Sequence, residues 1–213
     1  MISVLVTGAT TPVGERLVRS LVADTRVKHV VAVGMEAPEH ALPFSHGNRL
    51  TYVSVDLRRS RKVRELLFGI VRDLGVEVVV HLSQRRSARA VGRSVHDANV
   101  EALRSILDLS DRHPTIRRVV LQSFAVVYRV SLELPILVTE DHPLNLAPSA
   151  AQYVRDRVEA DLTACARMGL SDCEIVVLRT AEALAPGTGS QLYDYMDAPV
   201  SFRPAGFDPM INV

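Results

Sequence analysis

The sequence predicts an α/β fold, a doubly wound parallel sheet with helices on both of its faces. Short runs rich in Val alternate with amphipathic stretches of helical period, which is the order that strand–helix–strand units produce. Most of the runs are apolar throughout, as expected for strands that are covered on both sides. The chain also opens on a strand, a glycine turn and a helix, the unit that begins many such sheets.

Six runs have the composition of buried strands, namely Ser3–Val6, His29–Val33, Leu50–Val55, Glu77–Leu82, Arg118–Gln122 and Glu174–Leu178. Four stretches place apolar residues on one helical face, namely Val13–Ala23, Arg61–Leu74, Val95–Arg112 and Ala150–Met168. Because strands and helices alternate, the strands are expected to run parallel with a helix in each crossover. The segment Met35–Asn48 contains Pro and His and is expected to be an exposed loop.

The turn after the first strand has features of a phosphate-binding loop. Gly8 permits a tight turn, and Pro12 suits the first turn of a helix, where its missing N–H is not needed. Gly14 lets the helix lie close to the strand. Thr11 stands where the dinucleotide fingerprint usually has its middle glycine. The stretch therefore indicates either a dinucleotide site at a helix N-terminus or an ordinary strand–loop–helix start.

The composition argues against several kinds of partner. The 213 residues are 47% apolar, enough for a buried core, and 25 Lys and Arg balance 24 Asp and Glu. The net charge of +1 gives no electrostatic reason to expect nucleic acid or an anionic membrane as a partner. The basic run Arg58–Lys62 is short and is interpreted as a solvated face.

The sequence shows no sign of export, membrane insertion or metal binding. Cys165 and Cys173 form neither a CxxC pair nor a cluster with His, so no disulfide framework and no metal site is predicted. No apolar stretch approaches the roughly 20 residues that span a bilayer. The start of the chain lacks the basic region of a signal peptide. A soluble cytoplasmic protein is expected.

The end of the chain differs from the rest. Residues 1–180 hold the six predicted strands and are expected to form one domain. Residues 181–213 are irregular and rich in Pro and Gly, and Met210–Val213 resembles the opening of another strand. We therefore expect 181–213 to be the start of a second, truncated part.

A set of short motifs occurs in one order and at one set of spacings over nearly the whole chain. They are TGATTPVG at 7–14, Asp56-Leu57, His81-Leu82-Ser83, Asn99-Val100, Ser123 with Val127-Tyr128, Tyr153 with a basic residue four later, and Leu178-Arg179. This set resembles the extended short-chain dehydrogenase/reductases, in particular the NAD-dependent epimerase/dehydratase family. The resemblance implies a Rossmann-like domain that binds NAD or NADP. It also implies a smaller C-terminal domain for a nucleotide sugar or similar substrate, largely absent here.

The resemblance assigns the cofactor contacts residue by residue. The segment from Gly8 to Gly14 would cradle the pyrophosphate, through Thr10, Thr11, Pro12 and Val13. Asp56 would meet the adenine amino group and Leu57 would pack on the ring, although Asp56 could instead cap the following helix. Leu82 and Ser83 would line the ribose and phosphate on the nicotinamide side.

Two further positions bear on the cofactor. Asn99 lies inside a predicted helix, where Asn is a poor helix former, and the family uses it to join the fourth strand to this helix. The family often has an acid at the end of the second strand, for the ribose 2′-OH of NAD. Gly34 takes that place here, and Glu36 is a candidate substitute. No Arg stands close in sequence to favour a 2′-phosphate, so NAD is preferred and NADP stays open.

The catalytic set departs from the family. Tyr153 would be the general acid/base, with Arg157 in place of the Lys that lowers the Tyr pKa and holds the ribose. The hydroxyl donor should lie four residues before Tyr128, where the chain has Phe124. Its neighbour Ser123 is the remaining candidate hydroxyl but would point elsewhere. Losing such a donor typically costs about a hundredfold or more in rate.

Three hypotheses follow. The chain is an oxidoreductase, epimerase or dehydratase acting on a nucleotide sugar or related alcohol. Alternatively, it is a catalytically degenerate module that binds a dinucleotide for regulation, or a scaffold without a cofactor. By analogy with the family, the helices Val95–Arg112 and Ala150–Met168 could form a homodimer, although their apolar residues could equally be core.

Overall fold

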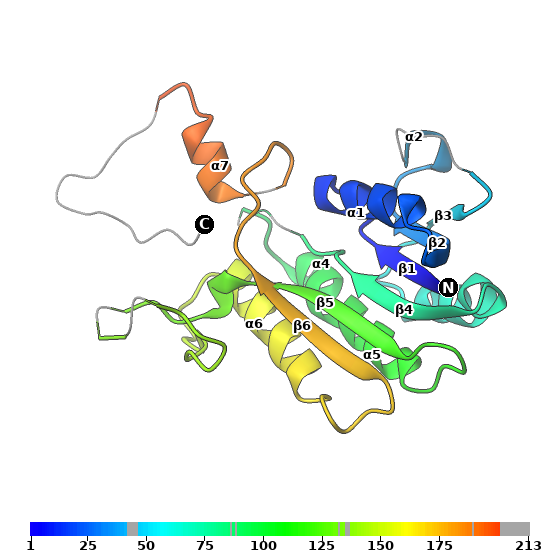
Figure 1. Cartoon of the computed structure of the whole chain (residues 1–213). Helices are drawn as coiled ribbons and strands as arrows, with labels where there is room; N and C mark the ends of the chain where they lie inside the picture. The colour runs from blue at the N-terminus through cyan, green and yellow to red at the C-terminus, as the bar shows by residue number, and fades with distance from the viewer. Residues whose placement is uncertain are drawn as a thin grey trace.

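The protein is built on one six-stranded sheet in which neighbouring strands run parallel. The computed structural model describes residues 1–41, 47–85, 87, 89–131, 133–134, 137–188 and 190–200. The strands lie in the order β3-β2-β1-β4-β5-β6 (Figure 1). The order reverses between β1 and β4, and ligands bind at such switch points in doubly wound folds. The fold class predicted from the sequence is confirmed.

All six predicted strands are present: β1 Ile2–Thr7, β2 Val27–Gly34, β3 Leu50–Ser54, β4 Val76–His81, β5 Arg118–Phe124 and β6 Glu174–Thr180. The α-helices of the described residues are α1 Pro12–Ala23, α2 Pro38–Ala41, α3 Ser60–Leu66, α4 Arg93–His96, α5 Ala102–Ser110, α6 Gln152–Cys165 and α7 Gln191–Met196. There are also π-helical segments at Leu67–Val71 and Asp97–Glu101, and a 3-10 turn at Ala125–Val127.

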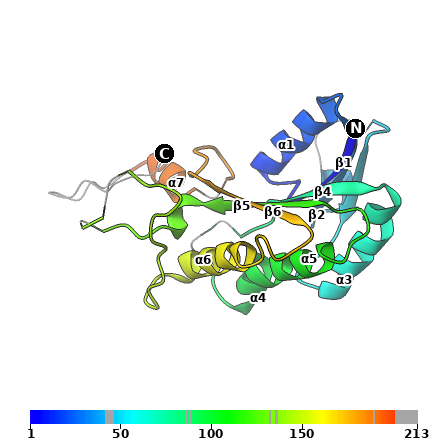
Figure 2. The same cartoon turned by 60° about the horizontal axis from the view of Figure 1, so that its bottom comes forward.

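Helices cover the two faces of the sheet unequally. Helix α1 lies on one face, whereas α3, α4, α5 and α6 lie on the other (Figure 2). Val4 and Val6 of β1 pack with Val18 of α1 in one buried cluster. Leu5, between them in sequence, packs with Leu103 of α5 in a second cluster. Because side chains alternate across a strand, apolar cover on both faces requires the unbroken apolar run seen in the sequence.

Two predicted helices are interrupted in the structure. The expected helix Arg61–Leu74 begins at Ser60 and becomes π-helical at Leu67. Gly69, which has no Cβ to restrict it, takes non-helical dihedral angles there (φ −99°, ψ −114°). The expected helix Val95–Arg112 is likewise divided into α4, a π-helical segment and α5.

The structure contains two short helices, α2 and α7, that the sequence did not predict. Helix α2 lies in Met35–Asn48, the expected loop, of which residues 42–46 are outside the described part. Helix α7 follows β6 in the part expected to be irregular, and Ser190 caps it by accepting a hydrogen bond from the N–H of Tyr193. The expected strand opening at Met210–Val213 lies outside the described residues.

Candidate functional site

The turn between β1 and α1 brings backbone segments into close contact. Gly8 has φ +69°, and a Cβ on it would lie 2.9 Å from the carbonyl carbon of Leu82 and 2.9 Å from the nitrogen of Ser83. A Cβ on Gly14 would lie 2.0 Å from the carbonyl oxygen of Gly8. Only glycine fits either position without rearrangement. The tight turn and the close approach of helix to strand are those that the sequence predicts.

Thr11 caps helix α1. Its hydroxyl accepts a hydrogen bond from the N–H of Gly14 at 3.1 Å and donates one to the carbonyl of Gly8 at 2.8 Å. Thr at this position satisfies a helix N–H that has no partner within the helix. The Thr-Pro pair before a helical pattern carried this signal, which the sequence reasoning missed. The N–H of Gly14 thus donates to the Thr11 side chain. A glycine at position 11 would leave this N–H free to bind a phosphate.

A cavity of about 270 Å³ opens beside this turn, at the carboxyl ends of β2 and β3, close to the smallest ordinary ligand pockets. Of the predicted cofactor residues, those that line it are Gly8, Thr10, Thr11, Asp56, Leu57 and Ser83. Those that do not line it are Pro12, Val13, Gly14, Leu82, Asn99, Tyr153 and Arg157. Of the second group, Tyr153 and Arg157 line a further space, the small one beside the Tyr153 ring.

Glu36 supplies a carboxylate at the end of β2. Its Oε2 accepts hydrogen bonds from the hydroxyl of Thr10 at 2.6 Å and from the N–H of Met35 at 3.0 Å. Partial burial opposes ionisation, but these hydrogen bonds prevail and lower the pKa of Glu36. A Cβ on Gly34 would lie 2.8 Å from the same oxygen and 2.6 Å from the hydroxyl of Tyr52. The carboxylate thus lies over Gly34, the position where the family often has its acid.

Asp56 is held by an arginine two residues away. Its carboxylate accepts hydrogen bonds from Nε and Nη2 of Arg58, both at 2.8 Å, and these lower the pKa of Asp56. The alternative role as a helix cap is wrong, because the residue at the N-cap of α3 is Arg59. Arg58 and Arg85 both line the cavity. No Arg is close to Glu36 in sequence, but the fold brings Arg58 and Arg85 to the cavity that Glu36 also lines, and this corrects the inference that no Arg is available there.

A residue that lines the cavity also carries a polar atom without a hydrogen-bond partner. Oε1 of Gln84 is buried and has no hydrogen-bond partner, and Gln84 lines the cavity. A buried acceptor without a partner costs about 1–3 kcal/mol. A ligand hydroxyl, such as that of a ribose, would remove this cost. Together with the glycine turn at Gly8, which lines the same cavity, this fits a dinucleotide.

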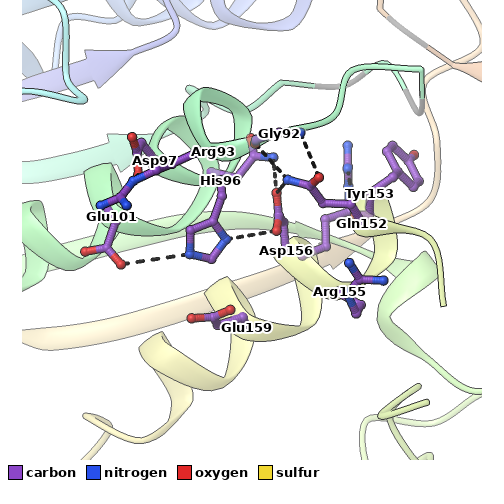
Figure 3. A network of polar contacts seen from close by, with 12 residues as sticks. Gly92, Arg93, His96, Asp97, Glu101, Gln152, Tyr153, Arg155, Asp156 and Glu159 are labelled. Atoms are coloured by element: carbon purple, nitrogen blue, oxygen red, sulfur yellow. Dashed lines mark hydrogen bonds and ion pairs between the residues drawn. The ribbon is translucent and has the colours of Figure 1, made fainter. Parts of the chain in front are cut away.

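A polar network holds α6 against α4 (Figure 3). Asp156 is buried and accepts hydrogen bonds from His96 Nδ1 at 3.0 Å and Asn99 Nδ2 at 3.2 Å. The Asp156 carboxylate raises the pKa of His96. Oδ1 of Asn99 accepts the N–H of Arg85 at 2.7 Å, which joins the segment after β4 to the helix, as the resemblance implies. The network fixes the helix that carries Tyr153.

Arg157 packs over two aromatic rings. Its guanidinium carbon lies 3.7 Å from the ring centroid of Tyr153 and 4.6 Å from that of Phe124, within the range of cation–π attraction. Its Nη1 donates to the carbonyl of Tyr153 at 3.3 Å. Tyr153, Arg157 and Phe124 are all buried. The charge expected beside the Tyr hydroxyl therefore lies over the ring.

Glu182, which the sequence did not single out, contacts the hydroxyl of Tyr153. The hydroxyl donates to Oε1 of Glu182 at 3.1 Å, and the Ser190 hydroxyl donates to Oε2 at 2.7 Å. The space left between these groups, Arg157 and Phe124 is about 10 Å³, room for about one water molecule. Glu182 lies 29 positions from Tyr153, so no local spacing could have shown the contact.

Ser123 belongs to a separate buried cluster. Its hydroxyl donates to Oδ2 of Asp161 at 2.6 Å. Arg179 donates to both oxygens of that carboxylate, at 3.0 Å and 2.7 Å, and to the hydroxyl of Tyr128 at 3.1 Å. Ser123 does not line the space beside Tyr153, whereas Phe124 does.

Within the described ranges, no helix has the length and apolar character needed to cross a membrane. In the same part of the chain, no three His, Cys, Asp or Glu side chains converge to hold a metal ion.

Comparison with known sequences gives one consistent match. A profile of the NAD dependent epimerase/dehydratase family matches residues 4–199. Uncharacterized proteins of Mycobacterium tuberculosis and Mycobacterium bovis are 28% identical over 201 residues, which cover 92% of this chain and 51% of theirs. The chain thus spans about half the length of these relatives.

Comparison with solved structures shows the same fold. The enzyme WbmH of Bordetella bronchiseptica, in complex with NAD+, superimposes with a TM-score of 0.71 at 21% identity, over 90% of this chain and 60% of that one. A UDP-galactose 4-epimerase gives 0.70 at 21% identity, over 92% and 61%. The dTDP-glucose 4,6-dehydratase of Bacillus anthracis, in complex with NAD, gives 0.68 at 20% identity, over 84% and 54%.

Proposed function

Because the chain belongs to the NAD dependent epimerase/dehydratase family, we propose that it binds NAD in the cavity beside the β1–α1 turn. The observation that carries this proposal is the cavity lined by Gly8, Thr10 and Thr11 at the start of helix α1, where a helix N-terminus can face an anion. The pyrophosphate would lie against Gly8, Thr10 and Thr11. The adenine would pack on Leu57, with Asp56 at its amino group.

Glu36 supports NAD as the preferred dinucleotide. An adenosine ribose in the cavity would bring its 2′-OH near this carboxylate, which can accept a hydrogen bond from it. A 2′-phosphate would meet a negative charge, since the pKa of Glu36 is lowered. Arg85 and Arg58 line the same cavity, and their positive charges would favour NADP.

A bound nicotinamide would supply hydride transfer, and Tyr153 would hold or release a proton at its hydroxyl. We propose that turnover is weak or absent, because Phe124 cannot donate a hydrogen bond and Arg157 lies over the Tyr153 ring. Catalysis on a nucleotide sugar or related alcohol is the second candidate, favoured by Tyr153 itself. The chain spans about half the length of its curated relatives. The proposal therefore concerns this chain alone and not the activity of a longer protein.

Calorimetric titration with NAD tests the proposed site. Binding in the micromolar range is expected. Ser83→Trp should abolish it by filling the cavity, whereas Ser149→Trp, in an exposed loop away from the cavity, should preserve it. Circular dichroism checks that both variants fold. No heat and no thermal stabilisation at millimolar NAD would overturn the proposal, because a ligand of the folded state stabilises it by mass action.

We also propose that α5 and α6 form a homodimer contact. A groove of about 550 Å³ is lined by α6, by Arg104 of α5 and by the loop at 145–148, and it includes Leu146 and Leu162, which are 68% and 42% exposed. Apolar side chains gathered at a groove favour association. Leu162→Glu should reduce the mass measured by light scattering, whereas Leu170→Glu, outside the groove, should not. A wild-type monomer at high concentration would contradict this.

A further inference from the structure

We propose that the site recognises the adenosine diphosphate half of its ligand, and that Glu182 closes the nicotinamide side. NAD, ADP-ribose and ADP would then bind with similar affinity. This inference rests on the proposed dinucleotide site and adds which part of the ligand carries recognition.

The first observation is that the hydroxyl of Tyr153 already has an acceptor. A phenol has a single proton to donate, and Tyr153 gives it to Oε1 of Glu182 at 3.1 Å. The other oxygen of Glu182 accepts from the Ser190 hydroxyl at 2.7 Å. Both side chains that hold Glu182 are buried, Tyr153 being 6% and Ser190 4% exposed. A ligand oxygen that needs this proton must displace Glu182.

The second observation is that the segment from Glu182 to Thr188 extends from Tyr153 to the start of helix α1. The hydroxyl of Thr188 lies 2.7 Å from the carbonyl of Ala183, which closes the segment on itself. A Cβ on Gly187 would lie 3.4 Å from Cγ of Pro12 in the first turn of α1. The loop between β6 and α7 lies beside this end of α1 in both views (Figures 1 and 2). The segment thus reaches from Tyr153 to the helix that would face the pyrophosphate.

The third observation is the difference in free volume. The cavity at the adenosine side measures about 270 Å³. The space beside Tyr153 measures about 10 Å³ and is lined by Phe124, Arg157 and Glu182, so it holds about one water molecule. Arg157 cannot serve a ribose while its guanidinium lies 3.7 Å from the Tyr153 ring centroid.

These contacts divide the binding energy unevenly. Adenine, the first ribose and the diphosphate enter an open cavity with ready acceptors. The nicotinamide and its ribose gain contacts only if the hydrogen bonds from Tyr153 and Ser190 to Glu182 break. The free energy gained from the new contacts is therefore offset by the free energy lost with the old ones. Recognition is therefore concentrated in the part that NAD, ADP-ribose and ADP share.

Parallel calorimetric titrations with NAD, ADP-ribose and ADP test the inference. Dissociation constants within about threefold of each other are expected. NAD binding more than about tenfold tighter than both ADP-ribose and ADP would overturn the inference and leave the proposed function intact. No binding of any of the three would instead overturn the proposed function.

Variants of the closing contact provide a second test. Glu182→Ala should strengthen NAD binding about tenfold, with ADP binding unchanged. Ser190→Ala removes only one hydrogen bond to Glu182, should act in the same direction with a smaller effect, and serves if Glu182→Ala does not fold. Glu174→Ala is the matched control, because Glu174 begins β6 and pairs with Arg118 on the surface. Equal NAD affinity in all three variants and the wild type would contradict the role of Glu182.

Discussion

The two ends of the candidate site differ in what fills them. At the adenosine end of the proposed site, Gly8 and Gly34 line an open cavity of about 270 Å³. At the catalytic end, Tyr153, Arg157 and Glu182 contact one another and leave about 10 Å³. The adenosine end has room for a ligand, whereas at the catalytic end the side chains contact one another and fill the space.

Under the proposed function, this difference would mean that the two ends of a family site can diverge separately. The cradle depends on backbone geometry, which a few glycines secure. Acid/base chemistry needs a hydroxyl donor, a Tyr and a cation at one point, and a change at any of them weakens the reaction. A chain can therefore keep the first end and lose the second.

Removing Asp161 tests whether the adenosine end depends on the separate buried cluster of Ser123 and Arg179, and it has the largest expected effect. Asp161→Ala should lower the free energy of unfolding by about 3–5 kcal/mol, because Arg179 loses its buried partner. Urea denaturation measures this loss. Asp108→Ala, at an exposed ion pair with Arg167, should cost less than about 1 kcal/mol. If the Asp161 variant still folds, a large loss of NAD affinity would break the comparison.

Lowering the pH tests the buried contact between β1 and β4 at the strand ends that precede the cavity. Nδ1 of His81 lies 2.8 Å from the Thr7 hydroxyl, and complete burial lowers the pKa of His81 to about 4. The unfolded chain binds this proton near pH 6.5, so the stabilisation is complete above that pH and is lost as pH falls toward 4. His81 should account for about 2.5 kcal/mol of lost stability between pH 7 and 4.5.

Denaturation curves at the two pH values isolate this effect. His81→Gln should show a smaller pH dependence, although it is less stable at pH 7. His40→Gln, at an exposed position, should keep the wild-type dependence. The same loss in His81→Gln as in the wild type would show that His81 is not the titrating group.

Changing the cofactor preference has the smallest expected effect and sharpens the account of the adenosine end. Glu36→Gln removes the charge over Gly34 while keeping a hydrogen-bond acceptor for Thr10. The ratio of NADP to NAD affinity should rise about tenfold, or about 1.4 kcal/mol, as measured by calorimetry. Glu39→Gln, on α2 and outside the cavity, is the control. An unchanged ratio of NADP to NAD affinity would show that Glu36 does not contact the adenosine ribose.

The sequence predicts the sheet well because the signal is local. Runs such as Val4–Val6 are apolar on both faces, and only a covered strand requires that. The break at Gly69 was harder to see, because a single glycine within an apolar helical pattern is usually tolerated. Helix α2 has four residues, too few to show a helical period.

The site was predictable only where it depends on neighbours in sequence. Gly8 and Gly14 follow from the turn, and the Thr11 cap was visible beside Pro12. The pairing of Asp56 with Arg58 could also be predicted, because the two residues are only two positions apart. Glu182 meets Tyr153 only through the packing of β6 and α6, and neither spacing nor composition reports such a contact.

A crystal structure of the chain grown with NAD tests the central claim most directly. The account predicts an ordered adenine against Leu57, with the hydrogen bond between Tyr153 and Glu182 intact and no nicotinamide beside Tyr153. An ordered nicotinamide ribose bonded to the Tyr153 hydroxyl, with Glu182 displaced, would contradict it.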